Sequence, residues 1–408
     1  MIPRFQPPLG GREIIAALTP SFSDDVRLFE DAFAKVMEQG HAIAFPYGRS
    51  GLLALLKCLG LSNRSVICPA YTCVVVPNAV VVSGNRPVFV DSGRDANMDL
   101  DHVRGFVDET TGAILATSIF GNPVDLDMLD DLRAKHPHVP VIQDCAHSFI
   151  TEWNSRPVHR EGAAAIFGLN VSKTMTAIFG GMVTTDDAEL ASALREHRAR
   201  TTTAPTLLKT MSRLAYAFAV APAFWPPLFG LTDRLRRAGL LDRFTRYYDE
   251  ELIELPDDHL VGMTGLEGRV GVEQTGRLSA MIEARRMYDG YYRSRLADVS
   301  GLEWLEEPHG SSVSHVVARV ADRQRVRARA AAMGVELGEV IEYSVPDLAA
   351  YRSLLSDDRS FPVSAVLSTT VINLPTSLRF DERKAAKVVG VLRRVLDGAK
   401  PPPALPVT

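Results

Sequence analysis

Short apolar runs alternate with helix-length segments over much of the first half of the chain. Those that predict strands are AIAF (42–45), SVICP (65–69), PVFVD (87–91), AILATS (113–118) and VPVIQD (139–144). The segments between them, such as 51–60 and 124–136, have the pattern of helices. Parallel neighbouring strands need a long crossover connection, which a helix supplies. The pattern therefore predicts an α/β domain with a mostly parallel central sheet flanked by helices, which FGLN (167–170) and GGMVTT (180–185) extend.

The pattern changes after Pro256. A long charged helical pattern covers 267–296, a strand pattern covers 314–321, and a further helix is predicted over 382–396. This order of elements predicts a smaller α+β C-terminal domain. The expected division is a large domain over 1–255, an interdomain helix and small domain over 256–400, and a Pro-rich tail over 401–408.

An apolar stretch without charge, 214–232, lies inside a predicted helical insertion near 205–245, with basic residues on both sides. Its length is close to that of a membrane-spanning helix. Three prolines, Pro222, Pro226 and Pro227, would remove backbone donors from such a helix, so a true span is not expected. Two interpretations stay open: a helix pair buried in the core or in a subunit interface, or a peripheral contact with a membrane.

Composition narrows the class of protein. A chain of 408 residues with 46% hydrophobic and 23% charged residues is typical of a soluble protein of two domains. The net charge of −4 and a pI near 6.2 provide no basic field for nucleic acid. The four cysteines have neither metal-ligand spacing nor the density of a disulfide scaffold, and no signal peptide is indicated. We therefore expect a cytoplasmic protein without a metal site.

Three groups follow or adjoin predicted strands, where open parallel sheets bind their ligands. Asp144 ends the strand 139–144, which places a carboxylate at the crevice or simply caps the next turn. The turn Gly48-Arg49-Ser50-Gly51 opens a helix, where backbone N–H groups and the helix dipole favour a phosphate. Lys173 is the one lysine in the segment 168–183, where desolvation would lower the pKa of its amine.

Together these groups are the parts that a pyridoxal phosphate site requires. A carboxylate at position 144 would keep the ring nitrogen protonated. A lysine at position 173 would hold the cofactor and then move a proton between substrate and cofactor.

Several blocks fall in an order that resembles the DegT/StrS family of sugar aminotransferases, over about residues 25–398. They are GRSGLLALLKCLGL, SVICPAYTCVVVPNAVVVSGNRPVFVD, VIQDCAHSF, SKTMTAIFGGMVTTDDAEL and INLPTSL. The resemblance implies a pyridoxal phosphate enzyme of fold type I, related to aspartate aminotransferase. It also implies a homodimer with shared active sites that transfers an amino group from L-glutamate to a nucleotide-linked keto-sugar.

Position by position, the resemblance makes Lys173 the Schiff-base lysine and Asp144 the partner of the ring nitrogen. His147 stands where the family has Gln or His near the phenolic oxygen of the cofactor. Arg49 and Ser50 match the phosphate-binding turn, although the family more often has Thr in place of Arg49.

The block that covers the face of the cofactor departs from the family. Thr72 follows the PAY segment, but Cys73 stands where the family often has a stacking aromatic residue. Tyr71 is the alternative stacking group.

Phosphate binding departs as well. Gly168 stands where the family usually has a phosphate-binding Ser, and either Asn170 or Ser172 is the expected substitute. The Asn-x-Arg segment that reaches a neighbouring subunit's site in the family is HLVGMTG here, with His259 as a candidate replacement.

Two other functions compete with amino transfer. Relatives that dehydrate sugars replace the lysine by His, and Lys173 argues against that chemistry. A non-catalytic regulatory or membrane-associated member of the fold would explain the missing Asn-x-Arg and the apolar stretch, but it leaves the combination of Lys173, Asp144 and His147 unexplained.

Overall fold

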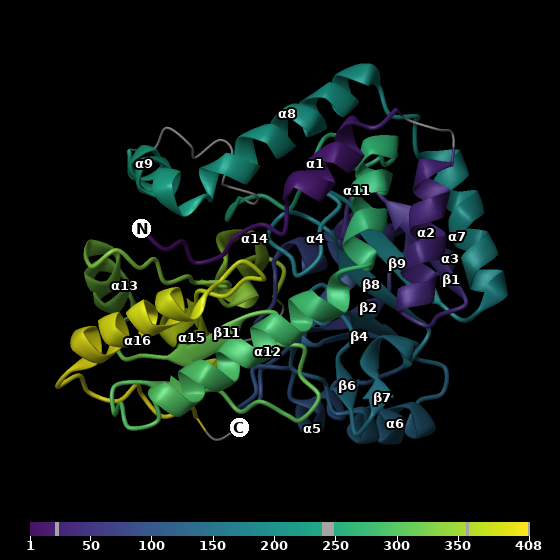
Figure 1. The fold of residues 1–408 in the computed structure, drawn as a ribbon. Helices are drawn as coiled ribbons and strands as arrows, with labels where there is room; N and C mark the ends of the chain where they lie inside the picture. Colours follow the sequence, from purple (N-terminus) through teal and green to yellow (C-terminus); the bar gives the residue numbers. More distant parts are fainter. Residues whose placement is uncertain (21–23, 239–248, 356–358, 407–408) are drawn as a thin grey trace.

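The structure is a computed structural model that describes residues 1–20, 24–238, 249–355 and 359–406. Its centre is a seven-stranded sheet in the order β1-β9-β8-β5-β4-β2-β3 (Figure 1). The strands are β1 (His41–Phe45), β2 (Ser65–Pro69), β3 (Arg86–Val90), β4 (Thr111–Thr117), β5 (Val141–Asp144), β8 (Ala164–Gly168) and β9 (Gly181–Thr185). Of these seven strands β9 runs antiparallel to its neighbours β1 and β8, and the pairs among β2, β3, β4, β5 and β8 are parallel. The predicted mostly parallel sheet is confirmed.

The strands bury side chains on both faces because helices cover the sheet on both sides. In β1, Ile43 and Phe45 join one core while Ala42 and Ala44 join the other. The first core includes side chains of α3 (Gly48–Cys58), α4 (Val75–Val82) and α7 (Ala188–Thr201). The second includes side chains of α2 (Asp25–Val36), α5 (Leu100–Val103) and α6 (Leu126–Lys135).

The smaller C-terminal domain is built on an antiparallel sheet in the order β10-β11-β12. Its elements are β10 (Glu303–Trp304), β11 (Val316–Arg319), α13 (Arg323–Ala332), α14 (Ala349–Arg352), α15 (Pro362–Thr370), β12 (Val371–Leu374) and α16 (Glu382–Leu396). The remaining short elements are α1 (Gly11–Leu18), β6 (Glu152–Trp153), β7 (Arg156–Pro157) and 3-10 turns at Ile119–Gly121, Val158–Arg160 and Val345–Asp347. The predicted fold class is confirmed, whereas the exact domain boundaries stay a prediction.

The long helical pattern over 267–296 forms two helices instead of one. They are α11 (Gly265–Thr275) and α12 (Leu278–Arg295), separated at Gly276 and Arg277. Glycine is a poor helix former, and the neighbouring Arg277 pairs through its side chain with the buried carboxylate of Glu13 on α1.

The apolar insertion also forms two helices, α8 (Leu207–Ala223) and α9 (Pro226–Arg237), bent by 108°. Figure 1 shows α8 running along the top of the molecule and α9 folding away at its end. The prolines act as predicted, since Pro222 stands in the last turn of α8 and Pro226 begins α9. Burial of the pair in this chain's own core is wrong, because Phe218, Trp225 and Leu231 are exposed. The last part of the predicted insertion, 239–245, lies outside the described residues.

Candidate active site

Lys173 lies in the loop between β8 and β9 and is half-buried. Burial lowers the pKa of its amine, and the guanidinium of Arg49 adds to this shift. The charges of Cys73 and Asp144 oppose it. Arg49, Cys73 and Asp144 are therefore each within electrostatic reach of Lys173, although they come from a helix, a loop and a strand.

Asp144 ends β5 and is buried with an exposed fraction of 3%. The backbone N–H of Ala146 donates to Oδ1 (3.1 Å), and the hydroxyl of Thr117 donates to Oδ2 (3.4 Å). Burial raises the pKa of this carboxyl, while these bonds and the Lys173 amine lower it. A carboxylate so placed favours a further cationic partner.

His147 is half-buried beside Phe120, and the two rings stack with centroids 6.3 Å apart. The N–H of Phe120 donates to Nδ1 (3.4 Å), so the neutral ring carries its proton on Nε2. Burial lowers the pKa of His147 well below its usual value, and the charges of Lys173 and His315 act in the same direction. The imidazole is thus a neutral hydrogen-bond donor.

His315 belongs to the same cluster and was missed by the sequence analysis. It directly precedes β11, and its ring centroid lies 5.0 Å from that of His147. Burial lowers its pKa to about 3, with Arg285, Lys173 and Arg4 contributing. Nothing in a histidine at the head of a predicted strand distinguishes it from an ordinary strand residue.

The turn Gly48-Arg49-Ser50 forms the first turn of α3, as the sequence predicts. A Cβ at Gly48 would lie 3.0 Å from the carbonyl oxygen of Phe167, so the turn packs closely on the end of β8. The hydroxyl of Ser50 donates to the carbonyl oxygen of His259 (2.9 Å). The first N–H groups of a helix have no partner inside it and suit an anion.

The Gly-Gly pair after Lys173 allows a close approach of backbones. Gly180 has φ +132°, and a Cβ at Gly181 would lie 2.2 Å from the backbone nitrogen of Gly48. The pair therefore lets β9 pack directly against the turn that begins α3.

The remaining predicted site residues differ in their burial and in their hydrogen-bond partners. Tyr71 is fully buried, donates to the carbonyl oxygen of Ile341 (3.2 Å) and contacts Phe120 with its ring. Thr72 is buried and Cys73 half-buried, next in the chain. Asn170 Oδ1 accepts hydrogen bonds from both the N–H (3.0 Å) and the hydroxyl (2.6 Å) of the exposed Ser172. Their roles toward a cofactor stay predictions.

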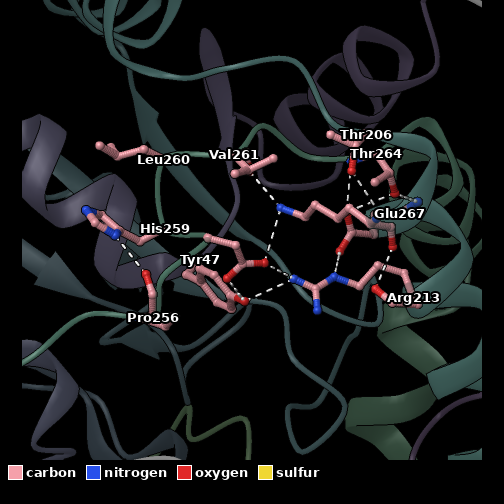
Figure 2. A network of polar contacts seen from close by, with 12 residues as sticks. Tyr47, Thr206, Arg213, Pro256, His259, Leu260, Val261, Thr264 and Glu267 are labelled. Carbon is pink, nitrogen blue, oxygen red and sulfur yellow. Dashed lines mark hydrogen bonds and ion pairs between the residues drawn. The ribbon is translucent and has the colours of Figure 1, made fainter.

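His259 lies in the segment that replaces Asn-x-Arg. Figure 2 shows its ring turned to Pro256, where Nδ1 donates to the carbonyl oxygen (2.7 Å). Its backbone contacts Ser50 of the same chain. A role for His259 in a neighbouring subunit also stays a prediction.

The residues present fit pyridoxal phosphate. They supply an amine of lowered pKa, a buried carboxylate at a strand end, a neutral imidazole donor and a helix N-terminus. The fold and this site define a pyridoxal phosphate enzyme of fold type I. The chain belongs to the DegT/DnrJ/EryC1/StrS aminotransferase family, whose model matches residues 17–393. The family resemblance, the cofactor and the aminotransferase class predicted from the sequence are confirmed.

Individual relatives are distant but cover almost the whole chain. The chain is 26% identical to GDP-perosamine synthase of Vibrio cholerae, over 92% of this chain and 94% of that protein. It is 24% identical to the enzyme of the same name from Caulobacter vibrioides, over 90% and 89%. The structure of E. coli GDP-4-keto-6-deoxy-D-mannose-3-dehydratase with bound hydrated PLP is similar with a TM-score of 0.77, at 17% identity over 96% and 99% of the two chains. At this identity the structural likeness concerns the fold.

Proposed function

We propose that this enzyme transfers an amino group from L-glutamate to a nucleotide-linked keto-sugar. The observation that carries the proposal is the amine of Lys173, with its lowered pKa, in one cluster with Asp144 and His147. When bound, pyridoxal phosphate supplies an aldehyde that exchanges amines and a ring that takes up electron density.

Lys173 is the proposed attachment point and proton carrier. Because burial disfavours the ammonium form, its Nζ holds an electron pair with which to attack a carbonyl. Once released, the same Nζ accepts a proton from the substrate carbon and returns it to another carbon.

Asp144 and His147 are the proposed positioning groups of the ring. The Asp144 carboxylate would accept a hydrogen bond from a protonated ring nitrogen and stabilise its charge. The Nε2–H of His147 donates to the phenolic oxygen. The N-terminus of α3, with Arg49, is the proposed phosphate site.

An amino-acid donor is supported by a buried cation at the edge of the cluster. Arg285 on α12 is 8% exposed, and its Nε donates to the carbonyl oxygen of Ser314 (3.3 Å). Among the described residues, no carboxylate forms an ion pair with it, and burial lowers its pKa to about 10. A buried cation of this kind favours an incoming carboxylate, and its charge already reaches His315.

The acceptor is inferred from the relatives. The two synthases and the dehydratase named above carry GDP-linked sugars in their names. These names support a nucleotide-linked sugar as the acceptor, and the name of the dehydratase also contains a keto group.

Two half-reactions test the proposal. Glutamate alone should convert the yellow holoenzyme to its aminated, colourless form, with one 2-oxoglutarate released per site. Nucleotide-linked keto-sugars offered next should restore the colour. Failure of every keto-sugar after successful loading with glutamate would contradict the acceptor class, and failure of glutamate would contradict the donor.

Dehydration of a sugar is the second candidate, favoured by the fold shared with the E. coli dehydratase. Lys173 opposes it, since the resemblance assigns a histidine to that position in dehydratases. Product analysis separates the two, because dehydration removes a hydroxyl group and leaves no nitrogen on the sugar.

We also propose that the enzyme is a homodimer with shared sites, that it is cytoplasmic, and that it makes peripheral contact with a membrane. Light scattering on the purified holoenzyme tests the first. The third is supported by the outer face of α8 and α9.

A further inference from the structure

Helix α8 buries its charged side chains and exposes apolar ones, which is the reverse of an ordinary surface helix. Its two charged residues, Lys209 and Arg213, point inward, with exposed side-chain fractions of 8% and 12%. Its exposed positions are all uncharged: Leu207, Leu208, Met211, Ser212, Ala215, Phe218, Ala219 and Pro222. On α16, by contrast, Arg393 and Arg394 are exposed.

A buried polar network fixes this orientation (Figure 2). Arg213 Nη2 donates to Asp258 Oδ2 (2.5 Å) and to the Tyr47 hydroxyl (3.0 Å), while its Nε lies 3.2 Å from Glu267 Oε1. Lys209 Nζ donates to the carbonyl oxygen of Val261 (2.7 Å). Turning α8 over would bury its apolar face and expose these groups, but it would break every one of these bonds. The apolar face is therefore held outward by the enzyme itself.

Helix α9 continues the apolar surface past the bend. Trp225, just before α9, is exposed by 58%, and Leu228, Leu231 and Leu235 on α9 are exposed by 43%, 59% and 38%, at spacings that place them along one side of the helix. No single described helix is long and apolar enough to cross a membrane, but α8 and α9 pass that test as a pair. A pair bent by 108° fits a position along a surface better than a span through it.

A cavity of about 560 Å³ opens at the bend. Trp225, Pro226 and Pro227 form apolar walls, and Arg379 and Lys384 of the small domain add cations. Arg379 donates to the carbonyl oxygen of Leu9 (2.8 Å), and Lys384 lies 2.6 Å from Asp381. Apolar walls with cations on the other side suit a molecule with an apolar tail and an anionic head.

We propose that α8 and α9 dock on an anionic phospholipid surface. Their exposed apolar side chains enter the headgroup region, and Arg379 and Lys384 meet a lipid phosphate at the cavity. Arg234 on α9 is also exposed. A second copy of this chain is the alternative occupant, and the experiment below distinguishes it from a lipid surface. An anionic surface complements these cations.

The test is flotation of the holoenzyme with phosphatidylglycerol-containing vesicles and with pure phosphatidylcholine vesicles. Binding should occur to the anionic vesicles and weaken as salt is added. The double variant Phe218→Ser/Leu231→Ser should bind at least about tenfold more weakly, since apolar burial supplies much of the affinity. Met287→Ser, which removes an exposed apolar side chain of α12, is the matched control and should bind normally.

Tryptophan emission gives a second measurement. Vesicles should shift the emission of the native protein to the blue. Trp225→Phe should remove that shift while keeping most of the binding, because the surface stays apolar. Lys384→Gln should reduce binding to the anionic vesicles.

Absence of binding at low salt, or equal binding to both kinds of vesicle, overturns the proposal. The proposal is also overturned if the native protein is a dimer that does not bind vesicles and the Phe218→Ser/Leu231→Ser variant is a monomer. That result would make this face an interface between copies of the chain. Circular dichroism and the glutamate half-reaction of each variant show that a loss of binding is not a loss of folding.

Discussion

Gly168 and Lys173 fit against each other: a Cβ built on Gly168 would lie 3.2 Å from Cε of Lys173. The family usually has a serine at this position, and its Cβ would make a tight contact with the lysine side chain here. Gly168 therefore gives Lys173 room in this structure, and it has no side chain with which to bind a phosphate.

Gly168→Ala should consequently disturb the lysine. A contact this close forces one group to move, and such overpacking costs about 1–3 kcal/mol. We expect pyridoxal phosphate to attach to the enzyme about tenfold more slowly or more slowly still. The visible absorbance of the bound cofactor measures this rate. Gly290→Ala is the control, because nothing lies within 4 Å of a Cβ there. Unchanged attachment in Gly168→Ala would mean that Lys173 holds the cofactor in a different conformation.

Lys173→Ala should abolish covalent attachment and slow transamination by at least about a thousandfold, since both attack and proton transfer depend on this amine. Borohydride reduction and peptide mapping of the native enzyme should find one pyridoxyl group, on Lys173. Lys135→Ala, at an exposed lysine, should behave as the native enzyme. An adduct on any other lysine contradicts the assignment.

Asp144→Asn should keep the cofactor but slow the glutamate half-reaction by at least about a hundredfold. An amide has no charge with which to stabilise a protonated ring nitrogen. Stopped-flow absorbance after mixing with glutamate measures this rate. A rate near that of the native enzyme would show that a different group faces the ring nitrogen.

Arg285→Gln should raise the KM for glutamate by about tenfold or more, the magnitude of a lost charged hydrogen bond. The keto-sugar half-reaction, begun from the aminated enzyme, should change little. Arg286→Gln, the neighbouring arginine, is the control. Because burial lowers the pKa of Arg285 to about 10, glutamate affinity in the native enzyme should fall as the pH rises through that value. Equal effects on both half-reactions would point to a purely structural role for Arg285.

His315 should make stability depend on pH. Burial lowers its pKa from 6.5 to about 3, so below pH 6.5 the unfolded chain binds more protons at this ring than the folded chain. The free energy of unfolding should therefore fall as the pH drops, by at most about 1.4 kcal/mol per pH unit from this group. Denaturant titrations from about pH 6.5 to 4.5 should give a smaller slope for His315→Asn than for the exposed control His138→Asn. Equal slopes would contradict a neutral His315.

The sequence predicted the parts of the fold that depend on local pattern. The strand 65–69 and the helix 382–396 were predicted with the bounds that β2 and α16 have. The break at Gly276 and Arg277 was missed, and so was the contact of Arg277 with Glu13, more than 260 residues away in the chain. The same limit applies to the site. Lys173, Asp144 and the α3 turn stand beside strands or glycines that mark them, whereas His315 and Arg285 join the cluster through the packing of the small domain. The exposure of the apolar face of α8 could not be predicted either. It depends on a buried ion pair that holds the opposite side of the helix inward, and hydropathy along the chain does not reveal such a contact.

Helix α12 contributes Leu278 and Ile282 to the second core of the large domain and Tyr288 and Tyr292 to the core of the small one. Because the unbroken helix α12 packs into both cores, unfolding of either core removes the packing contacts of about half of the helix. The two domains should therefore unfold together, and calorimetry should record a single transition whose van't Hoff and calorimetric enthalpies agree. Two separate transitions would mean that α12 breaks near Arg285 before either core is lost.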